Sequence, residues 1–589
     1  MQLNQATIAD LMRRMEQGRY TDVIAETARL IGQFPRVAGL HEIHGMACAR
    51  AGNFVAAEKA LRRAIKLMPK LASARFNLGI LFGRQQKWRQ AADCQQELLR
   101  LQPSNTHARC QLGIALFRQQ KLDPAKACFE RVVAEAPEMV DAHFHLGLMA
   151  RQNDEPAAAL AHFADVLAHR KDHFEALFNM GNIHRDLLQA EQARARFEAA
   201  LAVRPQHVDT MINLANVEML RHDLPAAISW LDQVIDIDPS NVNAAINRAN
   251  VEMQRLDMPA ALAWLDHALE IEPENVDAAF SRSLPCFLMD DLKAGFAAAE
   301  LRFEKTDPVK RLYHGKEPAW DGRQLGPDDL LVIHAEQGLG DSLMMIRFLV
   351  SANLSPGQVI ILVPTALVTL LASSFEGWSF QPLETHFRGW RGATLRCSFM
   401  SLPHLLGARW ETPPSGGGYL RAPDQSIRKW DTVLGAPSGP RVGLVWRGSP
   451  THRSDHLRSI GFEEFFAALP AGPDYLVLQK DMTDDEKHHL ASRPDLQVSI
   501  EQLDDFADTA GLAMHLDELV SVDTSVVHLC GALGVKTSAL VQHLPDWRWG
   551  LGRDTTVWYD SVRLVRQSRA NDWRAPLKDI TGRLEALLK

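Results

Sequence analysis

The 589-residue chain is predicted to form an α-solenoid of paired helices followed by two α/β lobes with parallel sheets. Two observations predict this fold class. A 34-residue repeat runs through the first half of the chain, and short β-branched segments alternate with helical periods in the second half. The composition agrees, because 46% hydrophobic and 23% charged residues are typical of a globular chain with a large core.

The 34-residue repeat is visible in three registers. Proline occupies the first, glycine or alanine the second and alanine the third, and phenylalanine follows the third by four residues in three repeats. These residues are Pro35, Pro69, Pro103, Pro137, Pro205, Pro239 and Pro273; Gly45, Gly79, Gly113, Gly147, Gly181, Ala215 and Ala249; Ala57, Ala91, Ala125, Ala159, Ala193, Ala227 and Ala261; and Phe129, Phe163 and Phe197. This is the tetratricopeptide (TPR) pattern, in which the small residue lets two helices approach and proline ends the second. We expect about eight repeats in residues 1–285, stacked as a superhelix with a degenerate first repeat.

Asparagines recur at two positions of the first helix of several repeats. They are Asn77, Asn179, Asn182, Asn213, Asn216, Asn247 and Asn250. Side-chain amides both donate to and accept from a peptide backbone, so we predict that these rows hold an extended segment of a protein partner on the concave face. The alternative is that they contact only water.

The second half is expected to hold a helical join and two lobes. Residues 286–328 contain the join, 329–435 the first lobe and 436–589 the second. The predicted strands are 330–333, 359–363, 442–445, 475–478, 498–500, 519–522 and 537–541. Strands that alternate with helices indicate parallel sheets, which bind ligands outside the carboxyl ends of the strands.

A glycine-rich loop at residues 334–342 follows the first predicted strand and opens a helix. Its glycines allow close approach of the backbone to a ligand. Asp341 stands at this edge as either a general base or a helix cap.

A second loop, at residues 521–528, is rich in hydroxyls and opens a helix that ends near Gly534. Asp523, Thr524, Ser525 and His528 lie where main-chain N–H groups and the helix dipole favour phosphate oxygens. The alternative is an ordinary capped helix with a packed histidine.

Two basic segments, 446–460 with Arg458 and 479–480 with Lys480, could meet a diphosphate or be solvated loops. The aromatic patch at 545–549 could stack on a base or sugar, or pack internally.

Several function classes are disfavoured. The net charge of −8 disfavours nucleic-acid binding, which usually requires a strongly basic domain. Seven scattered cysteines without a CxxC pair argue against a disulfide framework or structural zinc. No P-loop, GxSxG elbow or metal-ligand spacing occurs, and residues 326–589 hold no Asp-x-Asp pair. Because no apolar run reaches about 20 residues, we expect a cytoplasmic protein without a membrane span.

Taken in order, the motifs resemble those of bacterial TPR glycosyltransferases, whose catalytic half is similar to the heptosyltransferases of the GT-B fold with its two Rossmann-like lobes. The segments are 335–341 with Arg347, 444–450, 458–460, 478–480, 505–510, 521–533, 545–549 and 563–567. The architecture is also similar to O-GlcNAc transferases and flagellin glycosyltransferases.

The resemblance implies a metal-independent, inverting transfer from a nucleotide-sugar, with no other cofactor, to Ser or Thr of a protein, flagellin being the favoured acceptor by analogy. It implies that Asp341 is the base or orients the acceptor. It assigns the donor diphosphate to Asp523, Thr524, Ser525 and His528, helped by Arg458 and Lys480.

Residues 447, 449 and 535–537 depart from the family pattern and leave the donor sugar open. The alternatives are a non-enzymatic TPR scaffold or chaperone with a degenerate nucleotide-binding domain, and a transferase acting on a lipid or polysaccharide. The first repeat could also form a homodimer.

Overall fold

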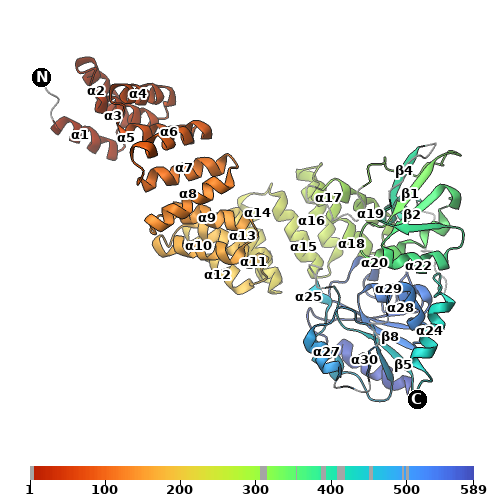
Figure 1. The fold of residues 1–589 in the computed structure, drawn as a ribbon. Coiled ribbons are helices and arrows are strands. Elements are labelled where there is room, and N and C mark those ends of the chain that lie inside the picture. The colour runs from red at the N-terminus through yellow and green to blue at the C-terminus, as the bar shows by residue number, and fades with distance from the viewer. Residues whose placement is uncertain are drawn as a thin grey trace. The chain divides into compact units, whose positions relative to one another are not determined.

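The computed structural model describes residues 5–305, 315–352, 354–385, 393–407, 418–449, 455–491, 493, 496–498 and 503–589. The chain divides into two compact units, Met1–Asp223 and Leu224–Lys589 (Figure 1). This division falls within the helical repeats, whereas the predicted boundaries at 285/286 and 435/436 stay predictions. Residues 450–454 of the predicted basic segment and 499–500 of a predicted strand lie outside the described residues.

The first unit is a solenoid of antiparallel helix pairs. Its helices are α1 (Gln5–Glu16), α2 (Tyr20–Gln33), α3 (Ala38–Arg50), α4 (Phe54–Leu67), α5 (Ala72–Arg84), α6 (Trp88–Leu101), α7 (Thr106–Arg118), α8 (Leu122–Glu135), α9 (Val140–Gln152), α10 (Pro156–His169), α11 (Phe174–Asp186), α12 (Ala190–Val203) and α13 (Val208–Leu220). The second unit continues with α14 (Leu224–Ile237), α15 (Val242–Gln254), α16 (Met258–Ile271), α17 (Val276–Ser281), α18 (Ser283–Leu288) and α19 (Leu292–Ala299).

The repeat registers pack as their residue types predict. A Cβ atom added at Gly113 would lie 2.7 Å from the Phe129 ring, and one at Gly181 would lie 2.5 Å from the Phe197 ring. The alanines of the second helices are buried against the same surface. Only glycine fits here without displacing the aromatic ring, so the predicted close approach of the two helices is confirmed.

The second unit contains two all-parallel sheets. The first has the order β3-β2-β1-β4, and the second has the order β10-β9-β8-β5-β6-β7. The strands are β1 (Leu330–His334), β2 (Val359–Val363), β3 (Ser379–Pro382), β4 (Thr394–Ser398), β5 (Arg441–Val445), β6 (Asp474–Val477), β7 (Leu496–Val498), β8 (Glu518–Val522), β9 (Thr537–Val541) and β10 (Val562–Arg566). The six-stranded order is that of a doubly wound Rossmann sheet, and the four-stranded sheet has its first four strands. The fold class predicted from the sequence is therefore confirmed.

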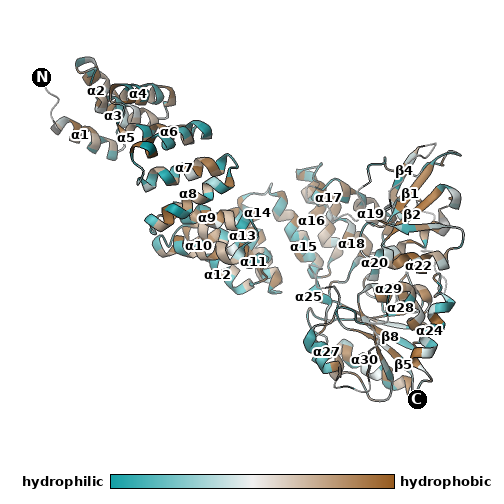
Figure 2. Ribbon diagram, in the orientation of Figure 1, coloured by the Kyte–Doolittle hydropathy of each residue, from teal (hydrophilic) through white to brown (hydrophobic). Residues whose placement is uncertain are grey.

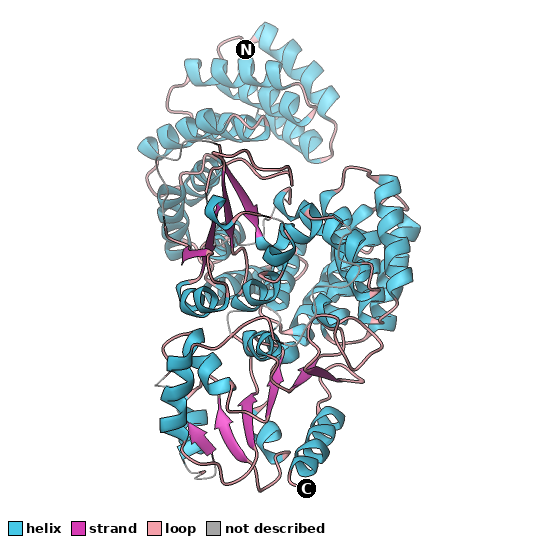
Figure 3. Ribbon diagram, turned by 90° about the vertical axis from the view of Figure 1, so that its right-hand side faces the viewer, coloured by secondary structure: helices cyan, strands magenta, loops and turns pink. Residues whose placement is uncertain are grey.

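Helices accompany both sheets (Figure 3). They are α20 (Leu339–Met345), α21 (Phe348–Ser351), α22 (Thr365–Ser374), α23 (Leu402–Leu405), α24 (Asp424–Leu434), α25 (Asp455–Arg458), α26 (Phe462–Ala467), α27 (Asp484–Ala491), α28 (Phe506–Ala513), α29 (Ser525–Leu533) and α30 (Arg574–Leu587). Figure 2 shows hydrophobic residues concentrated on the strands. Helix α24 packs against α28, and α20 packs against α29 between the two sheets.

The described helices include none that combines the length and the apolar character needed to cross a bilayer. All seven cysteines are free thiols.

Candidate functional site

The two predicted loops lie at the switch points of the two sheets, where the strand order reverses. The loop with Asp341 follows β1, which neighbours β4, and the loop with Thr524 follows β8, which neighbours β5. In doubly wound sheets this is the position at which ligands bind. The sequence thus placed both segments at ligand-binding positions of their sheets.

Asp341 has a capping role in the structure. One carboxylate oxygen, Oδ2, accepts a hydrogen bond from the main-chain N–H of Gly338 (3.0 Å) at the start of α20. The other oxygen, Oδ1, forms an ion pair with Arg548. Asp341 therefore stabilises the helix start and a guanidinium from the second sheet's lobe at the same time.

The helix start after β8 is half-buried. Thr524 is the N-cap of α29, and its hydroxyl lies 3.1 Å from the hydroxyl of Ser521. Ser525 opens the first turn, and Gly534 ends the helix in a left-handed conformation, as the sequence predicts. The first N–H groups of a helix lack intrahelical carbonyl partners, so this end attracts anions.

The two loops touch. A Cβ atom added at Gly340 would come within 2.6 Å of His528 Cδ2, so the backbone of the first loop lies directly against this imidazole. Helices α20 and α29 pack together beside this contact. The structure therefore brings the two predicted loops together at one junction.

His528 is fully enclosed at this junction. Its ring stacks on Trp549 with centroids 5.3 Å apart, and its Nδ1 lies 2.9 Å from the hydroxyl of Tyr559. Burial, and then the nearby Arg347 guanidinium, lower the pKa of His528 to about 3. Burial raises the pKa of Tyr559 well above its usual value, so it stays a phenol. Its O–H can donate to Nδ1, which would leave the proton of the neutral imidazole on Nε2.

Arg548 was not singled out by sequence reasoning as a site residue. It lies in the short 3₁₀ helix Trp547–Trp549, is buried, and contacts the carboxylates of Asp341 and Asp546. Burial lowers its pKa to about 10, which still leaves it a cation at neutral pH. Burial, and then the charge of Asp523, raise the pKa of Asp546.

Arg347 connects the segments that surround this junction. It is fully buried and donates to the carbonyl of Trp558 (2.6 Å) and the hydroxyl of Tyr419 (3.0 Å). Its guanidinium carbon lies 4.8 Å from the ring centroid of Tyr559. This arginine therefore fixes the first lobe against the residues that hold His528.

Arg458 bridges the switch point of the second sheet. Its Nη1 donates to the main-chain carbonyl of Asp523 (3.0 Å), and its Nε pairs with Asp455 (3.1 Å). Lys480 follows β6, one strand further from the switch point. It is exposed, and its Nζ donates to the carbonyl of Leu503 (3.4 Å). The structure thus places Arg458 beside Asp523, whereas the contact of Lys480 is with another loop.

The aromatic patch at 545–549 packs internally. Trp547 lies against Phe287 of α18, with centroids 4.6 Å apart, and Trp549 stacks on His528. Arg553 pairs with Asp290 (2.8 Å) in the turn between α18 and α19. Of the two alternatives for this patch, the structure shows packing, which ties the last repeats to the junction.

The asparagine rows are only partly available to a ligand. In the first unit Asn179 and Asn182 are buried; Asn179 accepts from Arg151 (2.5 Å), and Asn213 donates to Asn182 (3.2 Å). Sequence reasoning missed the arginines at 151 and 185, which recur with the repeat and each contact an asparagine 28 residues later.

The remaining asparagines differ in setting. Asn77 donates to Glu42 (3.2 Å), and Asn216 is half-buried. In the second unit Asn247 donates to the carbonyl of Asn243 (2.8 Å), and Asn250 is half-buried. Within the first unit, first helices of neighbouring repeats contact one another, for example α5 with α7 and α7 with α9, so the asparagines of that unit lie on the inner side of its stacked helices.

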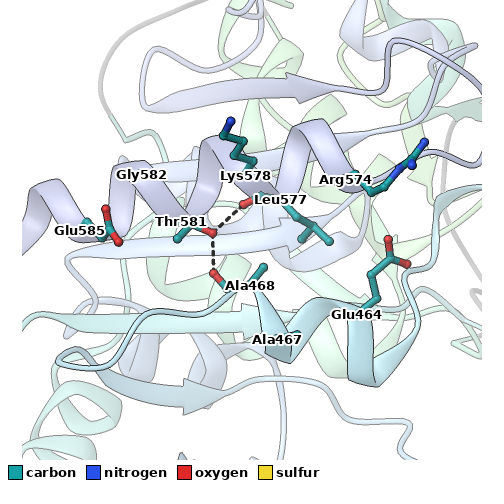
Figure 4. A pocket seen from close by; sticks show the side chains of 9 residues that line it. All are labelled: Glu464, Ala467, Ala468, Arg574, Leu577, Lys578, Thr581, Gly582 and Glu585. Atoms are coloured by element: carbon teal, nitrogen blue, oxygen red, sulfur yellow. Dashed lines mark hydrogen bonds between the residues drawn. The ribbon is translucent and has the colours of Figure 1, made fainter.

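Two surface hollows lie away from the junction. One, of about 510 Å³, separates α26 from α30 and is lined by Arg574, Lys578 and Thr581 among others; Thr581 donates to the carbonyl of Ala468 (2.6 Å) (Figure 4). The other, of about 730 Å³, lies in the first unit and includes Phe76 and His107. Neither is lined by a residue predicted from the sequence to be catalytic or ligand-binding.

Comparison with known proteins concerns the helical half. The tetratricopeptide repeat family model matches residues 12–72, 76–125, 110–176 and 178–242. No curated protein matches the chain.

Solved structures that are similar include YrrB, described as a TPR protein with an unusual peptide-binding site (22% identity, 32% of this chain and 96% of that chain, TM-score 0.29). A second is PilF of Pseudomonas aeruginosa (18% identity, 35% and 95%, TM-score 0.33). A third is the C-terminal part of a TPR protein from Cytophaga hutchinsonii (12% identity, 40% and 96%, TM-score 0.35). The tetratricopeptide part of the predicted resemblance is confirmed.

Proposed function

We propose that this protein is a glycosyltransferase that moves a sugar from a nucleotide-sugar donor to a Ser or Thr hydroxyl of a protein held by the repeats. The observation that carries the proposal is the contact of Gly340 with His528. It brings a carboxylate and a helix N-terminus, each from the switch point of a different sheet, to one junction. The sequence resemblance to TPR glycosyltransferases supplies the reaction type, because a fold alone does not specify one.

The donor's diphosphate is assigned to the start of α29. The main-chain N–H groups and hydroxyls of Thr524 and Ser525 stabilise the charge that grows on the leaving phosphate. The neutral His528 donates an N–H from Nε2, and Arg458 adds positive charge beside Asp523. This set needs no metal ion.

Transfer then follows as a direct displacement. The acceptor oxygen attacks the anomeric carbon, and the bond between that carbon and the diphosphate oxygen breaks. The diphosphate leaves with the bonding electron pair, and the hydroxyl proton goes to Asp341. Because the attack is from the opposite face, configuration at the anomeric carbon is inverted.

Asp341 must first exchange its ion pair with Arg548. An arriving diphosphate offers the guanidinium two anionic oxygens in a geometry that arginine prefers. Donor binding therefore releases the carboxylate, which couples the presence of the donor to the availability of the base.

The repeats supply the acceptor. Tetratricopeptide solenoids hold extended segments of partner proteins on their inner side. The half-buried Asn77, Asn213 and Asn216 are the candidate contacts in the first unit, and Asn247 and Asn250 are those in the second. Flagellin is the acceptor that we favour by analogy. We favour a protein acceptor over a lipid or polysaccharide, because the long solenoid would then bind the acceptor directly.

The test compares host proteins by mass spectrometry in the presence of the chain and of the variant Asp341→Asn. We expect a sugar mass on Ser or Thr with the native chain and its loss with the variant, by a factor of about 100 or more. The amide oxygen of the substituted side chain can still accept from the Gly338 N–H, so the start of α20 is retained. Asp546→Asn is the matched control, because it removes the other carboxylate from Arg548 and should cost far less.

Full activity in Asp341→Asn would remove this residue from the mechanism. A protein that consumes no nucleotide-sugar and modifies no host protein would instead be a non-enzymatic scaffold. A sugar found on lipid or polysaccharide alone would correct the acceptor while leaving the transfer in place.

A further inference from the structure

A second cluster of chemically able side chains lies within the repeats of the first unit. His143 on α9 and His162 and Asp165 on α10 each offer one ligand atom, and these atoms lie within 4.8 Å of one another. His143 Nδ1 is 3.4 Å from His162 Nδ1 and 3.2 Å from Asp165 Oδ2. This cluster is independent of the proposed transfer.

The proton on His143 can be placed. Its Nε2 lies 3.0 Å from the carbonyl oxygen of Pro137, which can only accept, so Nε2 carries the proton. In the neutral ring Nδ1 then carries a lone pair and faces a carboxylate oxygen, which is also an acceptor. Two acceptors at this distance need a proton or a metal cation between them.

In the two preceding repeats, arginine occupies the position that His143 occupies in this repeat. Arg75 and Arg109 occupy the register of His143, and each donates to the carbonyl of the corresponding proline. Arg75 also pairs with Glu97, which stands in the register of Asp165. In those repeats the arginine brings both the donor and the positive charge, whereas His143 brings only the donor.

The separations suit a metal ion. With bonds of about 2.0–2.1 Å from zinc to nitrogen, a tetrahedral site puts neighbouring ligand atoms about 3.3–3.4 Å apart. The two separations from His143 Nδ1, 3.4 Å and 3.2 Å, are close to this length, and all three ligand atoms lie within 4.8 Å of one another. The hydrogen bond from Nε2 to Pro137 is the outer contact that metal-binding histidines usually make.

We propose that His143, His162 and Asp165 bind a divalent transition-metal ion of the Zn²⁺ class, which staples α9 to α10. Two imidazoles and one carboxylate fill three positions of a tetrahedron, and the fourth is left to water or to a side chain of a bound partner. The ion supplies the positive charge that arginine supplies in the preceding repeats.

The experiment titrates ZnCl₂ into the full chain, freed of any histidine tag, by calorimetry and repeats the titration with CoCl₂ for its absorption spectrum. We expect one Zn²⁺ per chain, a tetrahedral Co²⁺ spectrum, and an increase in melting temperature on zinc binding. His162→Gln and Asp165→Asn should weaken binding at least about tenfold. His169→Gln, at an exposed histidine on the same helix, is the matched control and should bind as the native chain does.

His143→Arg is the decisive variant, because arginine is the residue of the preceding repeats. It should fold with native helicity and lose the zinc. Equal zinc binding by His143→Arg, His162→Gln and the control would overturn the proposal. So would the absence of zinc binding by the native chain, which would leave a proton-held His–Asp pair only.

Discussion

At the scale of single residues, the junction depends on groups that are buried and yet polar. Asp341 was recognisable from its place after a glycine-rich loop, and Thr524 from its place at a helix start. Arg548 was not recognisable from the sequence, because it lies among aromatic residues that are typical of internal packing. Its pairing with Asp341 joins positions more than 200 residues apart, which no local pattern encodes. The sequence therefore predicted the loops of the candidate site and missed the residue that now neutralises its carboxylate.

The burial of His528 has a consequence for stability against pH. Its pKa is about 3 in the folded protein and about 6.5 in an unfolded chain. Between these values the unfolded state binds the proton and the folded state does not. His528 therefore leaves the free energy of unfolding at its full value above about pH 6.5. As pH falls toward 3, this residue lowers the free energy of unfolding by up to about 1.4 kcal/mol per pH unit.

This is measured by urea unfolding of the full chain at pH 7.5, 6 and 5, followed by tryptophan fluorescence. Of the 13 tryptophans only Trp88 precedes residue 224, so the signal reports the second unit. His528→Phe keeps an aromatic ring against Trp549 and cannot titrate. We expect the native free energy of unfolding to fall more steeply with acidification than that of the variant; parallel curves would contradict a neutral buried His528.

At the scale of elements, the 34-residue period applies to the turns of the repeats as well as to their helices. The turn between the two helices of a repeat places one residue in the left-handed region at a spacing of 34: Gly18, Gly52, Gln86, Gln120, Asp154, Leu188, His222, Leu256 and Asp290. Only the first two are glycine, which adopts this conformation without strain. The other repeats tolerate the strain, because tertiary packing outweighs a local preference.

Leu188→Gly should therefore stabilise the first unit. Leu188 has a φ of 58° and is 54% exposed, so glycine relieves strain and sacrifices little packing. The left-handed conformation costs an ordinary residue about 1–2 kcal/mol, and glycine's entropy offsets about 0.5–1 kcal/mol of the gain. We expect a net gain of about 1 kcal/mol or less, seen as a higher melting temperature in calorimetry.

Leu187→Gly is the matched control. Leu187 is adjacent and similarly exposed, but its φ of −85° gives glycine no advantage. A melting temperature that rises equally in both variants, or falls in Leu188→Gly, would show that the turn is unstrained.

The strands divide into those that the sequence could reveal and those that it could not. Buried central strands such as β2 (VIILV) are continuous apolar runs, and the predicted range matches the observed one. β4 (TLRCS) and β3 (SFQP) lack such a run, and in β10 (VRLVR), at the sheet edge, arginines interrupt the apolar residues. These three strands were missed, since only their neighbours in the sheet make them strands.

At the scale of the whole molecule, the last repeats and the α/β region form one compact unit. Leu544 and Leu551, from the loop that carries Arg548, pack in one apolar cluster with Met253 and Leu288. The fading of the 34-residue phase predicts a boundary at 285/286, which stays a prediction. The division into compact units lies at 223/224.

A truncation pair tests this division. A chain beginning at Leu224 should unfold cooperatively in a calorimetric scan, since its apolar cluster stays covered. A chain beginning at Cys286 should be less stable or aggregate, because it exposes the apolar side chains of the 544–551 loop. Equal stability of the two truncations would instead favour the boundary at 285/286.

The central claim is that the junction between the two sheets binds the diphosphate of a nucleotide-sugar. It is tested most directly by calorimetric titration of the full chain with UDP, GDP, ADP, CDP and dTDP, alongside a Thr524→Val, Ser525→Ala double variant. We expect that at least one of these nucleotides binds once per chain and that the double variant binds it at least about tenfold more weakly. If none of the nucleotides binds, or if the double variant binds as tightly as the native chain, the start of α29 is not a diphosphate site.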